Sequence, residues 1–313
     1  MKAIVTGGAG FVGSNIALEL ESKGAEVIVI DDFSSGNFKT LKGFYGDVIA
    51  KDVNEIDWNK LDNVDVVFHE AAITDTTVMD QKRMMEANVE SIRKVLAYCV
   101  KNETRLVYAS SAAVYGNEPA PQSEEGILNP LNIYGYSKFV ADQVAMKVAR
   151  EAKIIIVGLR YFNVFGQREQ FKGPAASMIY QLAEQIRSGK RPRIFHDGHQ
   201  SRDHIYVKDV VGANLAAMQA KKSGVVNVGT GVATSFNRLI EIINGVLGTH
   251  LAPDYFNNLY SFYQNKTQAS TEHLKKLLGF QTKYTIEEGI EEYLKTIYTL
   301  KEPHFMSKEE VKK

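Results

Sequence analysis

Short apolar runs alternate with longer amphipathic segments over the first half of the chain. Ala3–Val5 lies almost at the N-terminus, and helical periodicity over Phe11–Lys23 follows it. Further apolar runs are short enough to be buried strands. They cover Glu26–Ile30, Val64–His69, Arg105–Ser110 and Ile154–Arg160, with a weaker one at Gly43–Val48. This alternation predicts an α/β fold with a doubly wound parallel sheet and right-handed crossovers.

The helices predicted between these strands include two long ones, Asp80–Asn102 and Tyr134–Ala152, and the polar loop Asn117–Pro130 precedes the second. The regularity fades after about Asn163. We expect loops, short strands and two helices there, before a last amphipathic helix. These three helices are Ser177–Ser188, Val210–Lys221 and Ile286–Leu300.

A glycine turn joins the first strand to the first helix. Gly8-x-Gly10-x-x-Gly13 has the spacing that lets backbone N–H groups and a helix N-terminus approach a pyrophosphate. The next strand is followed by Asp31, which is placed to bind a pair of ribose hydroxyls. The chain thus has a strand, a glycine turn, a helix, a second strand and an acidic residue in this order. This order predicts a Rossmann-type dinucleotide-binding domain.

The expected organisation follows from that placement. Residues 1–163 would form mainly the NAD(P)-binding domain, and residues 164–300 mainly a smaller α/β substrate-binding region. The chain is free to cross back between the two. Residues 301–313 form a charged tail, which we expect to fray.

Composition narrows the class of protein. The 313 residues include 37 basic residues (Lys and Arg) and 37 acidic residues (Asp and Glu). Because the two numbers are equal, no net positive charge favours binding to nucleic acid or to an anionic membrane. The single Cys99 excludes an intramolecular disulfide, and the seven histidines lack a metal-ligand spacing, so no metal is expected. No run has the length of a membrane span, and no signal peptide precedes the first strand, which predicts a cytoplasmic location.

A tyrosine and a lysine stand four residues apart in the second long helix. Tyr134 and Lys138 therefore share one helix face, which suits acid/base chemistry on an alcohol. A phenol has a pKa of about 10, and an adjacent ammonium together with an oxidised nicotinamide would lower it. Ser111 ends the preceding strand, where a hydroxyl could hydrogen-bond the reacting oxygen. The pair alone could equally be a solvated face, and the glycine turn and the serine favour the chemistry.

These motifs resemble a known family. Gly7-x-x-Gly10-x-x-Gly13, Ser111, Tyr134 and Lys138 stand in the order of the extended short-chain dehydrogenases/reductases that act on nucleotide-activated sugars. The resemblance covers residues 1 to about 300. It implies a nucleotide-sugar epimerase with a resident nicotinamide cofactor, and a homo-oligomer assembled through the two long helices.

Finer features resemble one branch of that family, the ADP-glycero-manno-heptose 6-epimerases. They are Arg160–Glu169, Lys172, Ala175–Met178, His69–Ala72 and Asp75–Thr77. The resemblance implies oxidation of ADP-heptose to a 6-keto sugar and re-reduction on the opposite face, for lipopolysaccharide inner-core synthesis. Lys172 would be a second catalytic acid/base beside Tyr134, and the assembly a pentamer.

The resemblance also implies two sets of contacts. The expected cofactor contacts are Gly7, Gly10, Phe11, Val12, Gly13, Asp31, Asp32, Lys39, Glu70, Ala71, Ala72, Ile73, Asn88, Tyr134, Lys138, Val164 and Lys172. The expected substrate contacts are Thr76, Ser111, Asn163, Ala175, Gln181, Phe195, His196, Gly198, Arg202 and Tyr263. Gln181 departs from the histidine often found there in the family.

The choice of cofactor rests on a few residues. Asp31 favours NAD, because a carboxylate binds the ribose diol and repels a 2′-phosphate, and Asp32 adds to that repulsion. The heptose epimerases nevertheless use NADP with a lysine nearby, and Lys39 could supply it. We expect NADP, with NAD as the alternative.

Other functions remain open. A UDP-sugar 4-epimerase would share every cofactor residue, and an idle NAD(P)-binding module would differ in lacking turnover. A sugar 4,6-dehydratase is disfavoured, because Ala112 and Ala113 occupy the places of its carboxyl groups.

Overall fold

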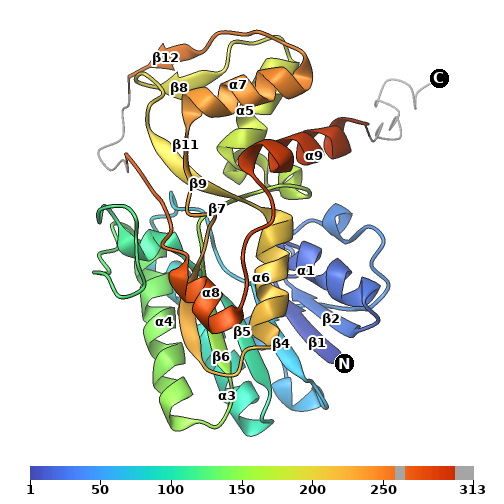
Figure 1. The fold of residues 1–313 in the computed structure, drawn as a ribbon. Coiled ribbons are helices and arrows are strands. Elements are labelled where there is room, and N and C mark those ends of the chain that lie inside the picture. The colour runs from blue at the N-terminus through green and yellow to red at the C-terminus, as the bar shows by residue number, and fades with distance from the viewer. Residues whose placement is uncertain (258–264, 300–313) are drawn as a thin grey trace, which may run out of the picture.

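The computed structural model describes residues 1–257 and 265–299. Their central feature is a seven-stranded sheet in the order β10-β6-β5-β4-β1-β2-β3, in which every neighbouring pair is parallel (Figure 1). The strands are β1 (Lys2–Thr6), β2 (Glu26–Asp31), β3 (Asp47–Ala50), β4 (Val66–His69), β5 (Arg105–Ser111), β6 (Ile156–Tyr161) and β10 (Gly224–Val228). The predicted doubly wound parallel sheet is confirmed.

Apolar residues point to both faces of this sheet, as expected for strands covered on two sides. In β1, Ala3 and Val5 join one core cluster and Ile4 joins the other, and all three are fully buried. Helices α1 (Phe11–Ser22) and α6 (Val207–Met218) cover the first face. Helices α3 (Ser91–Lys101) and α4 (Ile133–Glu151) cover the second.

The helix predicted over Asp80–Asn102 is not continuous. It is divided into α2 (Gln81–Met85), a π-helical turn (Glu86–Glu90) and α3. The π-helical turn carries Asn88. Its side chain accepts a hydrogen bond from the N–H of Ile73 and donates one to the carbonyl of Ile73. Such turns often occur where a side chain must be aimed at a site.

A second lobe contains the remaining strands and the helices α5, α7 and α9, and it lies above the main sheet in Figure 1. Its strands β7 (Asn163–Phe165), β9 (Ser201–Tyr206) and β11 (Ala233–Ser235) form one sheet, and β8 (Arg193–Phe195) pairs with β12 (Asp254–Phe256). The helices α5 (Met178–Arg187), α7 (Phe236–Leu247) and α9 (Ile286–Thr299) share one core cluster. The seventh strand of the main sheet, β10, and its covering helix α6 both follow residue 163, so the chain returns to the first lobe.

Two expectations for this half were wrong. The sequence interpretation placed no helix over Phe236–Leu247 or at α8 (Glu272–Leu278), and it began α6 three residues late. Apolar residues at helical spacing, such as Phe236, Leu239 and Ile243, bury one side of α7 in the core of the second lobe. The helix could therefore have been predicted from the spacing of its apolar residues. The end predicted for the last helix, Leu300, and the tail 301–313 lie outside the described residues.

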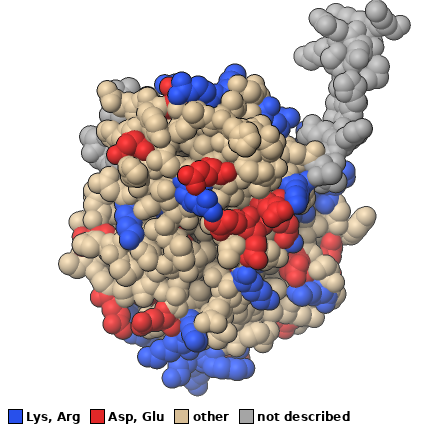
Figure 2. Space-filling model, turned by 45° about the horizontal axis from the view of Figure 1, so that its top comes forward, with Lys and Arg blue, Asp and Glu red and all other residues tan. Residues whose placement is uncertain are grey.

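The molecular surface carries both signs of charge. On the face seen in Figure 2, blue basic and red acidic side chains are interspersed, and neither covers that face. None of the helices within residues 1–257 and 265–299 combines the length and the apolar character needed to cross a membrane.

Candidate active site

The glycine turn between β1 and α1 packs against the end of β4. Gly7 has a φ of 65°, and a Cβ atom there would lie 2.6 Å from the backbone nitrogen of Ala71. A Cβ atom at Gly13 would lie 2.2 Å from the carbonyl oxygen of Gly7. Gly10 caps α1 and has no side chain to occupy the helix N-terminus. The turn is therefore a cradle of backbone N–H groups that a pyrophosphate fits.

We predict that Gly13→Ala weakens dinucleotide binding at least tenfold, since the added methyl group pushes the turn out of its position. Isothermal titration with the dinucleotide measures the change. Gly245→Ala in α7 is the matched control, because a Cβ atom there meets nothing within 4 Å. Equal affinity of Gly13→Ala and the wild type would contradict the role of the turn.

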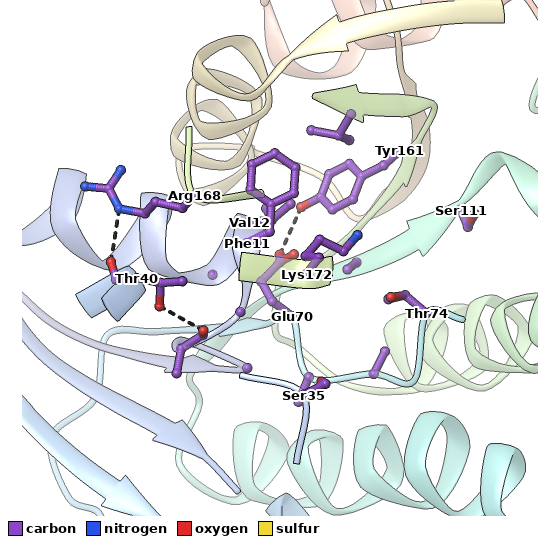
Figure 3. A pocket seen from close by; sticks show the side chains of 18 of the residues that line it. Phe11, Val12, Ser35, Thr40, Glu70, Thr74, Ser111, Tyr161, Arg168 and Lys172 are labelled. Atoms are coloured by element: carbon purple, nitrogen blue, oxygen red, sulfur yellow. Dashed lines mark hydrogen bonds between the residues drawn. The ribbon is translucent and has the colours of Figure 1, made fainter. Parts of the chain in front are cut away.

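A cavity of about 370 Å³ opens beside this turn, at the carboxyl ends of the main-sheet strands (Figure 3). Most of the residues expected to bind a cofactor, and all four expected catalytic residues, line it. These are Gly7, Gly10, Phe11, Val12, Gly13, Asp31, Glu70, Ala71, Ala72, Ser111, Tyr134, Lys138, Val164 and Lys172, and the expected substrate contact Asn163 lines it as well. Six separate segments of the chain thus converge on one space.

Asp31 joins the end of β2 to the glycine turn. Its carboxylate accepts hydrogen bonds from the backbone N–H groups of Ala9 (2.9 Å) and Phe33 (2.8 Å). Burial raises the pKa of Asp31, and these two hydrogen bonds oppose the rise. The carboxylate is thereby fixed at the rim where the ribose of a dinucleotide would lie.

Tyr134 and Lys138 lie in the first turns of α4, where the side chain of Asn132 caps the helix by accepting a bond from the N–H of Gly135 (2.8 Å). Lys138 is buried, and its Nζ donates to the carbonyl of Ala109 in β5 (2.8 Å). Tyr134 forms a hydrogen bond with Ser111 at the end of β5. The three side chains that the sequence singled out therefore meet at the junction of α4 and β5.

The protonation of these groups differs in part from expectation. Burial lowers the pKa of Lys138 to about 8, against the opposing fields of Glu70 and Asp142. Burial also raises the pKa of Tyr134, and the hydrogen bond with Ser111 opposes this rise. The shift is therefore opposite to the expected one: desolvation and the field of Glu70 raise the pKa of the phenol, and Ser111, not Lys138, opposes them. A positively charged nicotinamide is the further charge that would favour the phenolate.

Lys172 reaches the cavity from a 3₁₀ turn, Glu169–Ala175, in the second lobe. Its Nζ lies 5.7 Å from the ring centroid of Phe11, and burial lowers its pKa. The buried Glu169 carboxylate fixes the loop by accepting bonds from the N–H groups of Gly166 (3.0 Å) and Ser177 (2.6 Å). Lys172 therefore lines the cavity from a loop that Glu169 anchors, which favours a site residue over a solvated loop charge.

A buried ion pair supports α4 from behind. Asp142, one helical turn beyond Lys138, accepts a bond from Nε of Arg160 in β6 (2.9 Å) and another from the Tyr108 hydroxyl (3.0 Å). Arg160 also donates to the Tyr115 hydroxyl (2.9 Å). The sequence interpretation missed this network, although the spacing of Lys138 and Asp142 already placed both on one helix face.

Several expected cofactor contacts lie elsewhere. Asn88 is buried behind the cavity wall, where it bonds Ile73 and donates to the Ser137 hydroxyl (2.9 Å), so it supports the site from outside. Asp32 accepts bonds from Ser34 and, with Ile73, lines a separate hollow. Lys39 does not line the cavity. His69 is a buried, neutral core histidine as predicted, because burial lowers its pKa to about 3.

Most of the expected substrate contacts do not line the cavity. These are Thr76, Ala175, Gln181, Phe195, His196, Gly198 and Arg202, and Tyr263 lies outside the described residues. Gln181 instead donates to the carbonyls of Pro174 and Ala176, and Phe195 packs on Phe256. Apart from Thr76, these residues belong to the second lobe, whose lining of the cavity is confined to residues 163–172.

Sequence interpretation also missed part of the lining. The additional residues are Ala9, Ser35, Asn37, Thr40, Thr74, Ala109, Ser110, Tyr161, Phe162, Arg168 and Phe171. The position of Tyr161 at the carboxyl end of β6 was an available signal, because ligands bind at that edge of parallel sheets. Arg168 had no such signal, since it reaches Thr40 and Asn15 across more than a hundred residues of sequence.

The site combines a glycine turn that fits a pyrophosphate, an acid placed for a ribose, and a serine, a tyrosine and a lysine beside a parallel sheet. This combination defines a nicotinamide-dependent enzyme that acts on alcohols. The chain belongs to the NAD dependent epimerase/dehydratase family, whose model matches residues 3–229. This membership confirms the expected enzyme class, an NAD(P)-dependent isomerase of the nucleotide-sugar epimerase type.

Solved structures agree with the family. The chain is 39% identical to the ADP-L-glycero-D-manno-heptose-6-epimerase of Helicobacter pylori, with 96% of each chain covered and a TM-score of 0.90. It is 31% identical to a UDP-N-acetylglucosamine 4-epimerase from Methanobrevibacter ruminantium M1, with 95% and 98% covered and a TM-score of 0.90. A UDP-glucuronic acid 4-epimerase from Bacillus cereus, in complex with UDP-glucuronic acid and NAD, is 26% identical, with 95% and 100% covered and a TM-score of 0.84.

Among residues 1–257 and 265–299, no three His, Cys, Asp or Glu side chains are grouped so that they could hold a metal ion.

Proposed function

We propose that the protein is an ADP-glycero-manno-heptose 6-epimerase that supplies a precursor of the lipopolysaccharide inner core. The observation that carries this proposal is that Lys172 and Tyr134, from different lobes, line one cavity. Two proton partners in one cavity suit a reaction in which hydrogen leaves one face of a carbon and returns to the other. The 39% identity to the Helicobacter pylori enzyme supports the sugar assignment.

The chemistry required of the chain follows from the substrate. The C–H of a carbinol carbon outside a sugar ring is not acidic, so epimerisation goes through oxidation to a ketone. The bound nicotinamide supplies a hydride acceptor and, later, the donor. Tyr134 takes the hydroxyl proton, and Ser111 hydrogen-bonds the same oxygen. The positive charges of Lys138 and of the oxidised nicotinamide would favour the phenolate. After the ketone turns, Lys172 donates a proton of its own to the oxygen as the hydride returns to the opposite face of the carbon.

We predict that Lys172→Met lowers the epimerisation rate by about 10²–10³-fold, because one orientation of the ketone loses its proton partner. The half-reaction served by Tyr134 should persist, seen as a single-turnover absorbance change at 340 nm. Lys222→Met, at an exposed position, is the matched control. Epimerisation by Lys172→Met at the wild-type rate would show that the lysine is not the second base.

A UDP-sugar 4-epimerase is the second candidate, since the Methanobrevibacter enzyme has the same TM-score as the heptose epimerase. Assays with both ADP-heptose epimers, UDP-galactose and UDP-N-acetylglucosamine separate the two. Turnover of ADP-heptose alone is the expected result. Turnover of a UDP-sugar alone would overturn the sugar assignment, and bound dinucleotide without turnover of any sugar would indicate an idle binding module.

NADP is the cofactor that we propose, with NAD as the alternative. Arg168 supports NADP, because this guanidinium lines the cavity beside Thr40 and could pair with a phosphate. Asp31 and Asp32 favour NAD, the dinucleotide in the Bacillus cereus structure. Mass spectrometry of the cofactor released from the purified protein tests the choice, and NAD alone would overturn it. Cytoplasmic location and assembly into a homo-oligomer, a pentamer by resemblance, remain predictions.

A further inference from the structure

Arg168 connects the second lobe to the lobe that carries the glycine turn. It follows β7 and lines the cavity. Its Nε donates a hydrogen bond to the carbonyl of Thr40 (3.0 Å), and its Nη1 donates one to the side-chain oxygen of Asn15 (2.8 Å). Figure 3 shows the guanidinium extended toward Thr40. One side chain thus reaches two elements of the other lobe, α1 and the 3₁₀ turn Phe38–Leu41.

Both contacts continue to the glycine turn and the start of α1. The hydroxyl of Thr40 donates to the carbonyl of Ala9 in the glycine turn (2.8 Å). The side-chain amide of Asn15 donates to the carbonyl of Phe11 in the first turn of α1 (2.8 Å) and to the carbonyl of Gln167 in the second lobe (3.0 Å). The cradle that fits a pyrophosphate is therefore linked to the second lobe by two chains of hydrogen bonds.

The local structure favours a role for these contacts. The backbone of Arg168 has a φ of 77°, a left-handed conformation that residues with a side chain rarely adopt and that persists where surrounding contacts hold it. Thr40 is 2% exposed, so water does not compete for its carbonyl or its hydroxyl. Both acceptors of the guanidinium are neutral oxygens, so the contacts position Arg168 without neutralising its charge.

Epimerisation through a ketone makes one demand on the bound dinucleotide. The hydride that the dinucleotide accepts must return to the same sugar, so the reduced form has to stay bound until the ketone has turned. Its loss midway would leave the sugar oxidised. A link between the cradle and the second lobe meets this demand, because the cradle then moves away from the cavity only when the link breaks.

We propose that Arg168, with Thr40 and Asn15, forms a clasp between the lobes that keeps the dinucleotide bound through the whole reaction. Arg168 is a positioning residue in this role, because it acts on the dinucleotide through the glycine turn. The need for retention during turnover rests on the proposed function. The effect on release of the dinucleotide does not, since it is measured without a sugar.

The experiment measures how fast the dinucleotide leaves. The purified protein is loaded with NADPH or with NADH and chased with an excess of the oxidised dinucleotide, and the fall in nicotinamide fluorescence gives the dissociation rate. We expect Arg168→Met to release both dinucleotides at least about tenfold faster than the wild type. Arg191→Met is the matched control, because Arg191 also donates to two carbonyls of the second lobe but does not line the cavity.

Thr40→Val tests the clasp without a change to the arginine. It removes the hydroxyl that binds the carbonyl of Ala9 and keeps the backbone carbonyl that accepts from Arg168. Its dissociation rate should rise as well, whereas Thr40→Ser, which keeps the hydroxyl, should release the dinucleotide at the wild-type rate. Because Arg168→Met already breaks this chain of hydrogen bonds, adding Thr40→Val to it should give no further increase.

The two dinucleotides separate the clasp from direct pairing with a phosphate. If Arg168→Met released NADPH faster but not NADH, the arginine would act by pairing with the 2′-phosphate, and the clasp would be wrong. An unchanged rate in either single variant, folded by circular dichroism, would also overturn it, as would a multiplied rate in the double variant. If no sugar turns over but both single variants release both dinucleotides faster, the proposed function fails while the clasp stands.

Discussion

Tyr134→Phe is expected to lower the rate of epimerisation by about 10³-fold while the dinucleotide remains bound. The phenol lines the cavity together with Ser111, and in the proposed mechanism its loss removes the proton acceptor for the sugar hydroxyl. Lys138 stays in place, because its Nζ is held by the carbonyl of Ala109 and not by the phenol. Steady-state epimerisation gives the change in kcat, and titration calorimetry gives the dinucleotide affinity.

Tyr136→Phe is the matched control for this variant. Tyr136 lies two residues further along the same helix, is 47% exposed and does not line the cavity. Its hydroxyl can therefore be removed with less than a twofold change in kcat expected. If the two variants had equal activity, another group would have to carry the alcohol proton.

Arg160→Met is expected to destabilise the fold by about 3–5 kcal/mol, because it leaves the buried Asp142 carboxylate without its cation. Both side chains of this pair are 5% exposed, so water does not replace the lost partner. The Tyr115 hydroxyl loses a donor at the same time. Urea denaturation followed by circular dichroism measures the free energy of unfolding.

Two further variants show how much of the lost stability comes from the unpaired Asp142 carboxylate and how much from the changed shape of the side chain. Arg238→Met breaks two ion pairs, with Glu241 and Glu287, whose arginine is 51% exposed, and it should cost less than about 1 kcal/mol. Adding Asp142→Leu to Arg160→Met removes the unpaired carboxylate and should recover a large part of the lost stability. A loss for Arg160→Met no larger than that for Arg238→Met would mean that the buried pair contributes little.

The first half of the fold could be predicted because its signals are local. The runs that became β1, β5 and β6 are short and apolar and bounded by polar residues, and the glycine turn stands directly between β1 and α1. Helical spacing placed Tyr134 and Lys138 on one helix face, and the glycine turn and Ser111 favoured a role in chemistry. Nothing in that spacing, however, shows that burial raises the pKa of the phenol.

The second half was harder because its strands are short. β7, β8, β11 and β12 have three residues each, too few for an alternating pattern to stand out from a loop. Residue contacts of long sequence separation were also out of reach. Glu70 meets Tyr161 and Arg168 meets Thr40 only because the chain folds back, and no local pattern records either approach.

The return of the chain to the main sheet as β10 ties the two lobes together. A fragment that stops at residue 163 would lack both β10 and α6, and would leave β6 as a bare edge with its apolar side chains uncovered. Such a piece would be prone to aggregate. The main-sheet lobe is therefore completed only after the chain has passed through part of the second lobe, so the two lobes cannot fold one after the other in the order of synthesis.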